Sequence, residues 1–562
     1  MTQGQPAKAT PVGAYEGGLP APLFFLALAF AGAGSYYGSI AFWAASVLML
    51  AAAWKAERSE WGSSRLGLAA AAYAAAVMLS VFATSSAYTA AGLFHPLMLA
   101  LSYLVLRGCA HRDEKAIAYA TGAFGLVVGA WGLLQIGFLG VARASAFFET
   151  PATYAVVLSL ILMPLLAAVA TGKREAAIVF AAAFLAAAVF AAESRGALLA
   201  LAAGTGSVAI LGMRARLLQW RGVARVALLL AVGWAAVLAI RSAPAFEAPS
   251  VGVTARAESS ISRLELFALS WKARREQPLA GSGYLTFGYI LEQGRAQVPS
   301  YGESHETAFV HNDYLQTLLE LGPVGLLALL GLTVLPPVQA YRRLPVLAED
   351  QRLPVVASAS ALLAMSVHAL VDFPFYVPAC LLLYGALLGT LDRRLNAATI
   401  GVPHAWHSTR WYRPMRAAAL TIAAVLLLRP VAAEIAAEWG LRKSIAGDAQ
   451  STAFWLAAAQ RIEPRDWRYH WYAGQFWELQ ATQSGRREAA RMALQAYAAG
   501  FDANPLEVRN LLGLISMHRR HRALLDAPVG RDTLQAWLAQ AEALAPFNRA
   551  VRSERAWLGA AK

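Results

Sequence analysis

The sequence predicts an all-α fold: a polytopic membrane bundle of about thirteen transmembrane helices, followed by a C-terminal helical repeat domain. Of the 562 residues, 58% are hydrophobic and 15% are charged, whereas a soluble domain carries about 25% charged residues. The apolar residues form long blocks, and blocks of about 17–25 residues can cross a bilayer. After about residue 433, aromatic and charged residues interleave at a regular spacing. These observations exclude a soluble enzyme, a disordered chain and a disulfide scaffold.

The apolar blocks define the expected spans in order. We expect them near 20–34, 37–54, 66–84, 88–106, 116–138, 151–171, 174–192, 194–213, 225–240, 313–340, 353–371, 375–391 and 413–432. The first span is short enough to resemble a signal peptide. We expect it to be a retained anchor, because only Lys8 precedes it and a second span follows at once.

These spans divide the chain into five parts. We expect a cytoplasmic N-terminus (1–19), nine helices (20–240), a large outer loop (241–312), four helices (313–432) and an outer tail (433–562). One set of alternate short loops holds 20 Lys and Arg residues and the opposite set holds 2. Positive loops are retained in the cytoplasm, which places the large loop and the tail in the periplasm or on the cell exterior. The net charge of +14 then belongs to cytoplasmic loops and indicates no nucleic-acid partner.

The two basic residues on short outer loops are Arg143 and Arg195. An arginine at membrane depth costs about 2.5–3.5 kcal/mol, so it needs an anionic partner or a path to the interface. For Arg195 that partner is either Glu193 or an anionic ligand at the outer leaflet. The two cysteines, Cys109 and Cys380, are far apart in apolar surroundings, which favours neither a disulfide nor a zinc site.

The outer loop contains an amphipathic helix around residues 261–271. Its apolar positions recur every three to four residues, at Ile261, Leu264, Phe267 or Ala268, and Trp271. We expect this face to lie on the membrane surface or to pack over the bundle. Arg263 and Arg274, eleven residues apart, are expected to share a face. Pro278 ends the helix, and Gly281-Ser282-Gly283 is more consistent with a plain turn than with a phosphate loop.

The segment 302–322 carries two histidines and four acids at the start of a membrane helix. The zinc-protease pattern H-E-x-x-H fails, because Phe309 occupies the second histidine position after His305. We therefore expect no metal here. Asp313, Gln316 and Glu320 share one helix face, and such a polar face in a bundle usually lines a watery cavity. His311, at the mouth of this helix, is suited to general-base chemistry.

The segment from His311 to Gly322 (HNDYLQ, then ELG) resembles the signature of the O-antigen ligase and O-antigen polymerase superfamily of bacterial membrane glycosyltransferases, which includes protein O-oligosaccharyltransferases. Further stretches resemble this family in the same order, over roughly residues 110–395. They are Arg143 to Phe148 with Pro151, Ser194-Arg195-Gly196-Ala197, Arg263 with Trp271 and Pro278-Leu279, and His368 to Pro374. Around Arg143 the usual glycine and asparagines are replaced by Ala146, Thr150 and Ala152.

The resemblance implies a metal-independent, inverting transfer of a glycan from undecaprenyl pyrophosphate to an acceptor hydroxyl, without a cofactor. The implied pyrophosphate clamp is Arg195 and Arg263, with Arg143 as a third member, because guanidinium groups hold diphosphates well. His311 is the implied base; the alternatives are an acceptor hydrogen-bonder or a helix cap. The expected supporting residues are Asn312, Asp313, Glu320, His368 and Asp372. For the last two, structural support is as plausible as substrate contact.

The tail repeats with a period of 41 residues, seen in Trp455, Ala496 and Trp537 and in the prolines Pro464, Pro505 and Pro546. A helix ending at a proline turn, repeated three times, predicts an α-solenoid that resembles tetratricopeptide repeats. Such a surface either binds a protein partner or stabilises the bundle by stacking on it.

Within this enzyme class, the repeats favour a polymerase of O-antigen or exopolysaccharide units, by analogy with the family. The alternatives are a ligase to lipid A–core and a protein O-oligosaccharyltransferase. A polysaccharide or lipid transporter is the rival of another class. A transporter predicts charges in mid-helix along a pathway, whereas here the polar groups gather at the outer end.

Overall fold

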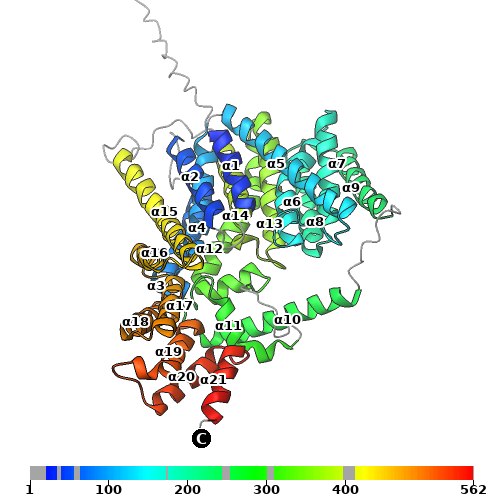
Figure 1. The fold of residues 1–562 in the computed structure, drawn as a ribbon. Coiled ribbons are helices and arrows are strands. Elements are labelled where there is room, and N and C mark those ends of the chain that lie inside the picture. The colour runs from blue at the N-terminus through cyan, green and yellow to red at the C-terminus, as the bar shows by residue number, and fades with distance from the viewer. Residues whose placement is uncertain are drawn as a thin grey trace, which may run out of the picture.

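The computed structural model describes residues 20–33, 39–55, 64–109, 111–172, 175–242, 253–299, 309–396 and 412–560. Throughout these residues the regular elements are helices, with no strand, so the all-α prediction is confirmed. The helices form a bundle, and the C-terminal helices extend away from one side of it (Figure 1).

A helix occurs at each of the thirteen expected spans. They are α1 (Pro20–Ala33), α2 (Ser39–Lys55), α3 (Arg65–Ala83), α4 (Ala90–Gly108), α5 (His111–Phe138), α6 (Pro151–Ala170), α7 (Ala176–Ala191), α8 (Arg195–Arg214), α9 (Trp220–Arg241), α12 (Asp313–Arg343), α13 (Glu349–His368), α14 (Pro378–Leu395) and α15 (Tyr412–Ile445). Within the described residues, eight helices are long and apolar enough to cross a membrane: α3, α4, α5, α6, α8, α9, α12 and α15. The chain is therefore a multi-pass membrane protein. Thirteen spans remain a prediction, because α1, α2 and α7 are short and α13 and α14 carry charges at one end.

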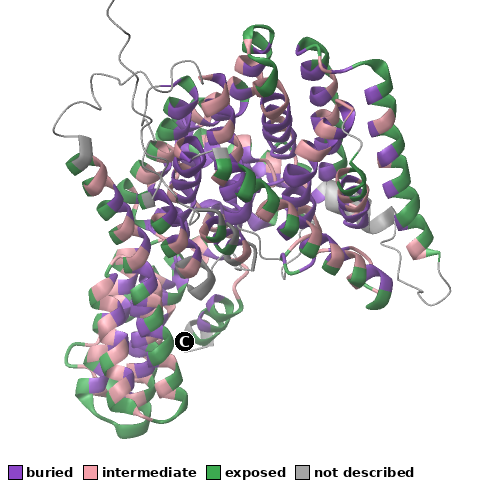
Figure 2. Cartoon of the chain, turned by 90° about the horizontal axis from the view of Figure 1, so that it is seen from above, coloured by how far each residue is buried: buried purple, intermediate pink, exposed green. Residues whose placement is uncertain are grey.

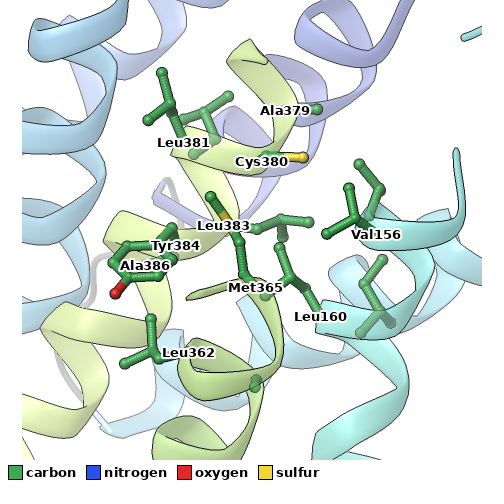
Figure 3. Close-up of a cluster of buried hydrophobic side chains, with 14 of the residues drawn as sticks. Val156, Leu160, Leu362, Met365, Ala379, Cys380, Leu381, Leu383, Tyr384 and Ala386 are labelled. Atoms are coloured by element: carbon green, nitrogen blue, oxygen red, sulfur yellow. The ribbon is translucent and has the colours of Figure 1, made fainter. Parts of the chain in front are cut away.

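The centre of the bundle is built by α4, α6, α13 and α14. Figure 3 shows Val156 and Leu160 of α6 facing Met365 of α13 and Leu383 of α14, and these side chains are all buried. Burial is concentrated inside the bundle and exposed residues along its outside (Figure 2). Membrane helices associate by close packing, which small residues permit. At Gly389 an added Cβ would lie 2.3 Å from the Tyr103 carbonyl oxygen, so α14 lies directly against α4.

Asp392 connects three helices by side-chain bonds at one end of the bundle, which we term the inner end. Its carboxylate accepts hydrogen bonds from Ser64 Oγ at 2.7 Å and Tyr103 OH at 2.7 Å and pairs with Arg107 Nε at 3.1 Å. Both charged side chains are almost fully buried. Nearby, Glu114 pairs with Arg393 and Arg394. The positive loops predicted to be cytoplasmic meet at this end.

Helix α12 is broken at Gly322, where the sequence predicted a single uninterrupted helix from residue 313 to 340. Gly322 has φ 68° and ψ −170°, and Pro323 supplies no N–H to continue the hydrogen-bond ladder. The carbonyls of Leu319 and Glu320, freed by the break, accept hydrogen bonds from the N–H groups of Ser282 at 3.1 Å and Gly283 at 2.9 Å. The Gly281-Ser282-Gly283 segment is thus a turn, as expected, and it caps the outer part of α12.

The amphipathic outer helix exists, and the face that packs on protein differs from the face that the spacing singled out. Helix α10 (Val253–Glu276) ends before Pro278, as expected. It buries Leu266 and Leu269 against α11 (Phe287–Gly294), whereas Leu264 and Trp271 are 65% and 53% exposed. Both faces carry apolar residues, so spacing alone could not identify the face that packs.

The tail consists of three consecutive helix pairs with one recurring turn. The pairs are α16 (Ala449–Ile462) with α17 (Trp467–Ser484), α18 (Arg487–Ala503) with α19 (Val508–Arg520), and α20 (Arg531–Leu544) with α21 (Arg549–Ala560). In each pair the first helix is followed by one C-cap residue and then by a proline, which is Pro464, Pro505 or Pro546. The 41-residue period therefore corresponds to a repeated helical hairpin, and its kinship to tetratricopeptide repeats remains a prediction.

The expected boundary at residues 432–433 falls inside a helix, because α15 runs unbroken from Tyr412 to Ile445. The repeats dock on the bundle near the end opposite Asp392. Tyr88 OH donates to Glu463 Oε1 at 2.8 Å, and Asn504 Nδ2 donates to Tyr289 OH at 2.8 Å. The repeats and the bundle are therefore in direct contact on the outer side.

Candidate functional site

Three helix ends meet at the end of the bundle opposite Asp392, which we term the outer end. They are the first residues of α8 and α12 and the last residues of α13. The N–H of Asp313 donates to the Ala369 carbonyl at 2.8 Å, which joins α12 to α13. An added Cβ at Gly196 would lie 3.4 Å from His368 Cε1 and 2.9 Å from Val371 Cγ2, so α8 begins directly against the end of α13.

His311 lies where these helix ends meet. Its backbone has φ 60°, a left-handed conformation that non-glycine residues rarely adopt and that is often found at functional sites. Its Nδ1 lies 3.1 Å from Oδ1 of Asp372, and its ring packs edge-on against Phe373 with centroids 5.0 Å apart. The His311 side chain is 19% exposed, so a substrate can reach it from outside.

Asp372 orients two imidazoles. Its Oδ2 lies 3.3 Å from His368 Nε2, while its Oδ1 faces His311. Burial opposes ionisation of Asp372, but its hydrogen bonds to His311 and His368 outweigh burial and hold its pKa below the ordinary value. An ionised carboxylate only accepts hydrogen bonds, so Nδ1 of His311 carries a proton. In the neutral imidazole, this tautomer leaves Nε2 of His311 as the nitrogen that can accept a proton.

Arg263 and Arg195 flank this pair of imidazoles. Nη1 of Arg263 donates to the Val371 carbonyl at 3.0 Å, which brings its guanidinium next to Asp372. Arg195 is the first residue of α8 and is exposed; a Cβ added at the following Gly196 would touch His368. The structure therefore brings His311, Arg195 and Arg263 to the same end of the bundle. Arg274, expected on the same face as Arg263, instead donates to carbonyls of residues 277–279 and caps α10.

Arg143 is positioned differently from the other two arginines. Its Nε donates to the Ala192 carbonyl at 3.0 Å and its Nη2 to the Glu193 carbonyl at 3.3 Å. These bonds attach the α5–α6 loop to the turn that precedes Arg195. The carboxylate of Glu193, expected as a possible partner of Arg195, pairs with Arg241 at 2.6 Å.

The supporting residues of α12 have mainly structural contacts. Asn312 Oδ1 accepts from the Leu315 N–H at 2.9 Å and caps the helix. Asp313 Oδ2 accepts from the Phe375 N–H at 2.9 Å. Glu320 accepts from the Leu285 and Phe287 N–H groups at 2.9 and 3.1 Å. Asp313, Gln316 and Glu320 are fully buried, so the expected water-lined face is wrong. Neighbouring backbone donors occupy this face in place of water.

Two contacting residues were missed from the sequence. Gln135 holds the Arg143 loop, because its Oε1 accepts from the N–H groups of Ser145 and Ala146 at 3.1 and 2.7 Å. Arg241 donates to the Ala142 carbonyl at 2.9 Å. Each of these two residues is a polar residue near the outer end of an apolar span, and this position could have identified it. Their partners, in the loop of residues 142–146, could not be identified from the spans.

No group of three or more metal-ligating side chains occurs among the residues that the structure describes. His305 and its neighbouring acids lie outside those residues. At the outer end, the arrangement offers an imidazole that can accept a proton and exposed or half-buried guanidinium groups that can bind an anion. It is suited to a displacement with an anionic leaving group.

Residues 180–330 match a family model described as O-antigen ligase. The matched segment contains Arg195, Arg263 and His311, whereas Arg143, His368 and Asp372 lie outside it. The match confirms the resemblance to the O-antigen ligase superfamily and supports a membrane enzyme that transfers glycans. No curated protein matches the chain.

Proposed function

We propose that this O-antigen ligase-type chain is an inverting glycosyltransferase that moves a glycan from undecaprenyl pyrophosphate to an acceptor hydroxyl, without a metal or a cofactor. The observation that carries the proposal is the 3.1 Å contact between His311 and Asp372 at the end of the bundle where Arg195 and Arg263 also lie. A polarised imidazole beside guanidinium groups supplies both a base and an anion clamp.

In the proposed reaction, Nε2 of His311 takes the proton of the acceptor hydroxyl. The hydroxyl oxygen attacks the anomeric carbon while the bond from that carbon to the pyrophosphate oxygen breaks. The pyrophosphate leaves with the bonding electron pair, and Arg195 and Arg263 stabilise the charge that it gains. Asp372 stabilises the protonated imidazole in the way that a buried carboxylate supports histidine in hydrolytic triads. We propose that Arg143 holds the turn before Arg195.

The polar groups support this reaction over transport. A transport pathway predicts charged side chains midway along the spans. In the described part of the chain, the ion pairs of the bundle instead cluster near helix ends, as with Arg107–Asp392 and Arg241–Glu193.

Removal of the base and of one clamp residue tests the proposal. His311→Ala and Arg195→Ala are expected to abolish glycan transfer in membranes while the protein level stays normal. His311→Asn is a second variant, since asparagine tolerates the left-handed backbone but cannot act as a base. Arg221→Ala, an exposed arginine at the start of α9, is the matched control and is expected to retain transfer. Normal transfer by His311→Ala and Arg195→Ala would overturn the proposal.

For the acceptor, we propose the hydroxyl of another repeat unit, which makes the enzyme a polymerase. A strain without the gene would then carry single-unit surface glycans. Long chains stranded on the lipid would indicate a ligase to lipid A–core, and unmodified glycoproteins would indicate a protein O-oligosaccharyltransferase.

A further inference from the structure

A groove lies between α8 and α12 on the opposite side of mid-membrane from His311. It has a volume of about 540 Å³. Its walls are formed by one stretch of α8, one stretch of α12 and a single residue of α13: Ala203, Gly206, Ser207, Ile210, Leu211, Pro337, Val338, Tyr341, Arg342 and Leu363. Ile210 is 57% exposed, so the groove opens outward from the bundle, toward lipid.

Arginines surround the inner end of this groove. Arg342 lines it, and the guanidinium carbon of Arg214 lies 5.1 Å from the centroid of the Tyr341 ring. Both arginines are exposed, and among the described residues no carboxylate pairs with either of them. Stacking on Tyr341 holds Arg214 beside the groove and leaves its donors available.

Other arginines at the same end are already bound. Arg107 pairs with Asp392, and Arg393 and Arg394 pair with Glu114. Arg352 donates to the carbonyls of Leu347 and Ala215. Arg214 and Arg342 therefore differ from these neighbours in having charge and donors to offer a ligand.

The length of the groove identifies the kind of lipid. From Ala203, the outermost α8 residue of the lining, to Arg214, which lies beyond the lining at the inner end, is eleven residues. That is about 16 Å along a helix, close to half of the roughly 30 Å hydrocarbon core. An acyl chain of one leaflet fills that length. The outermost α8 residue of the groove, Ala203, lies eight residues after Arg195. The groove is therefore separate from the outer end, where the carrier lipid of the proposed reaction would bind.

We propose that this groove binds an anionic glycerophospholipid of the leaflet at the inner end. One acyl chain lies along α8 and α12, and the phosphate and the anionic headgroup contact Arg214 and Arg342. Basic sites between membrane helices commonly bind such headgroups. This lipid is distinct from any glycan donor and stabilises the contact between α8 and α12.

Native mass spectrometry of the full chain in a neutral detergent tests this inference. The protein is mixed with phosphatidylglycerol or with phosphatidylcholine of the same acyl chains. We expect the wild type to retain phosphatidylglycerol preferentially. At about fivefold in affinity for each arginine near the membrane surface, the double variant Arg214→Gln/Arg342→Gln is expected to bind phosphatidylglycerol about 25-fold more weakly.

Two further variants separate the groove from general surface charge. Gly206→Leu fills the groove without changing charge, and its Cβ meets no atom within 4 Å; it is expected to weaken the binding of both lipids. Arg221→Gln removes an exposed arginine of α9 outside the groove and is expected to bind as the wild type does. Helical circular dichroism and a single elution peak verify that each variant is folded.

Three outcomes would overturn the inference. They are equal retention of the two lipids by the wild type, a loss in Arg221→Gln as large as in the double variant, and displacement of phosphatidylglycerol by an uncharged long-chain polyprenol. The last would assign the groove to an isoprenoid tail.

Discussion

Two buried carboxylates at opposite ends of the bundle have different partners. Asp392, at the inner end, is held by a guanidinium and two hydroxyl groups, from Arg107, Tyr103 and Ser64. Asp372, at the outer end, is held by two imidazoles, those of His311 and His368. Arg107, Tyr103 and Ser64 are buried, and the half-buried Asn396 at the end of the same helix also donates to Asp392. His311, by contrast, is 19% exposed and has a left-handed backbone.

The comparison shows how a carboxylate with purely structural contacts differs from the one to which we assign a role in transfer. Asp392 binds a permanent cation and two hydroxyl groups from neighbouring helices, so it joins α3, α4 and α14. Asp372 binds imidazoles, which can exchange protons, and one of them, that of His311, reaches solvent. The environment of a buried acid, more than its burial, indicates its role.

The largest effect is expected at Asp372. In Asp372→Asn the amide can no longer stabilise a protonated His311 or fix its tautomer, and loss of the corresponding carboxylate in hydrolytic triads costs about 10⁴-fold in rate. We expect glycan transfer in isolated membranes to fall by about 10²–10⁴-fold, with a normal protein level and melting temperature. Transfer above a tenth of the wild-type rate would contradict the assigned role of Asp372.

The inner carboxylate is expected to behave in the opposite way. Asp392→Ala leaves the buried Arg107 without its counter-charge, and breaking a buried ion pair costs about 3–5 kcal/mol. The melting temperature in detergent and the amount of protein in the membrane should both fall. Transfer per folded molecule should stay near the wild-type value; a stable variant that lacks activity would reverse the comparison.

The fold was predicted well where the signal was local. Apolar blocks gave the positions of the helices, and the 41-residue period gave the hairpins of the tail. The motif that begins at His311 indicated that the candidate site lies at the outer end of the bundle. The pairing of His311 with Asp372, 61 residues apart, and of Arg107 with Asp392, 285 apart, depends on helix packing, which a single sequence does not encode locally.

One expectation was incomplete and another was wrong, each for a physical reason. Helix α10 has apolar residues on two faces, so periodicity identified the exposed face of Leu264 and Trp271 but not the packed face of Leu266 and Leu269. The polar residues of α12 suggested a watery face, because the sequence does not reveal that the backbone of residues 285–287 bonds to Glu320. The Gly322-Pro323 pair did signal a break, but the length of the apolar block favoured a continuous helix.

A smaller effect is expected at the break in α12. In Gly322→Ala the new Cβ would lie 2.0 Å from the Leu279 carbonyl oxygen, in a backbone with φ 68°. Left-handed strain costs about 1–3 kcal/mol, so the melting temperature should fall moderately and transfer should fall with it, because the outer part of α12 carries the Glu320 contacts. An unchanged melting temperature would mean that the Gly281–Gly283 turn moves aside readily.

The smallest effect is expected at Arg274. This arginine caps α10 through exposed bonds, so Arg274→Gln should cost less than about 1 kcal/mol and leave transfer intact. Arg263→Gln, eleven residues earlier on the same helix, should abolish transfer. Equal behaviour of the two variants in a membrane transfer assay would remove Arg263 from the proposed clamp.

The break at Gly322 also separates the chemistry from the thickness of the membrane. Residues 323–343 form the apolar part of α12, and a spanning helix adapts to a thinner or thicker bilayer by tilting. The outer turns, 313–321, are anchored to residues 282–287 and 369–375 by hydrogen bonds. We therefore expect a change of lipid composition or growth temperature to alter the tilt of residues 323–343 while the imidazole keeps its position relative to the arginines of the outer end.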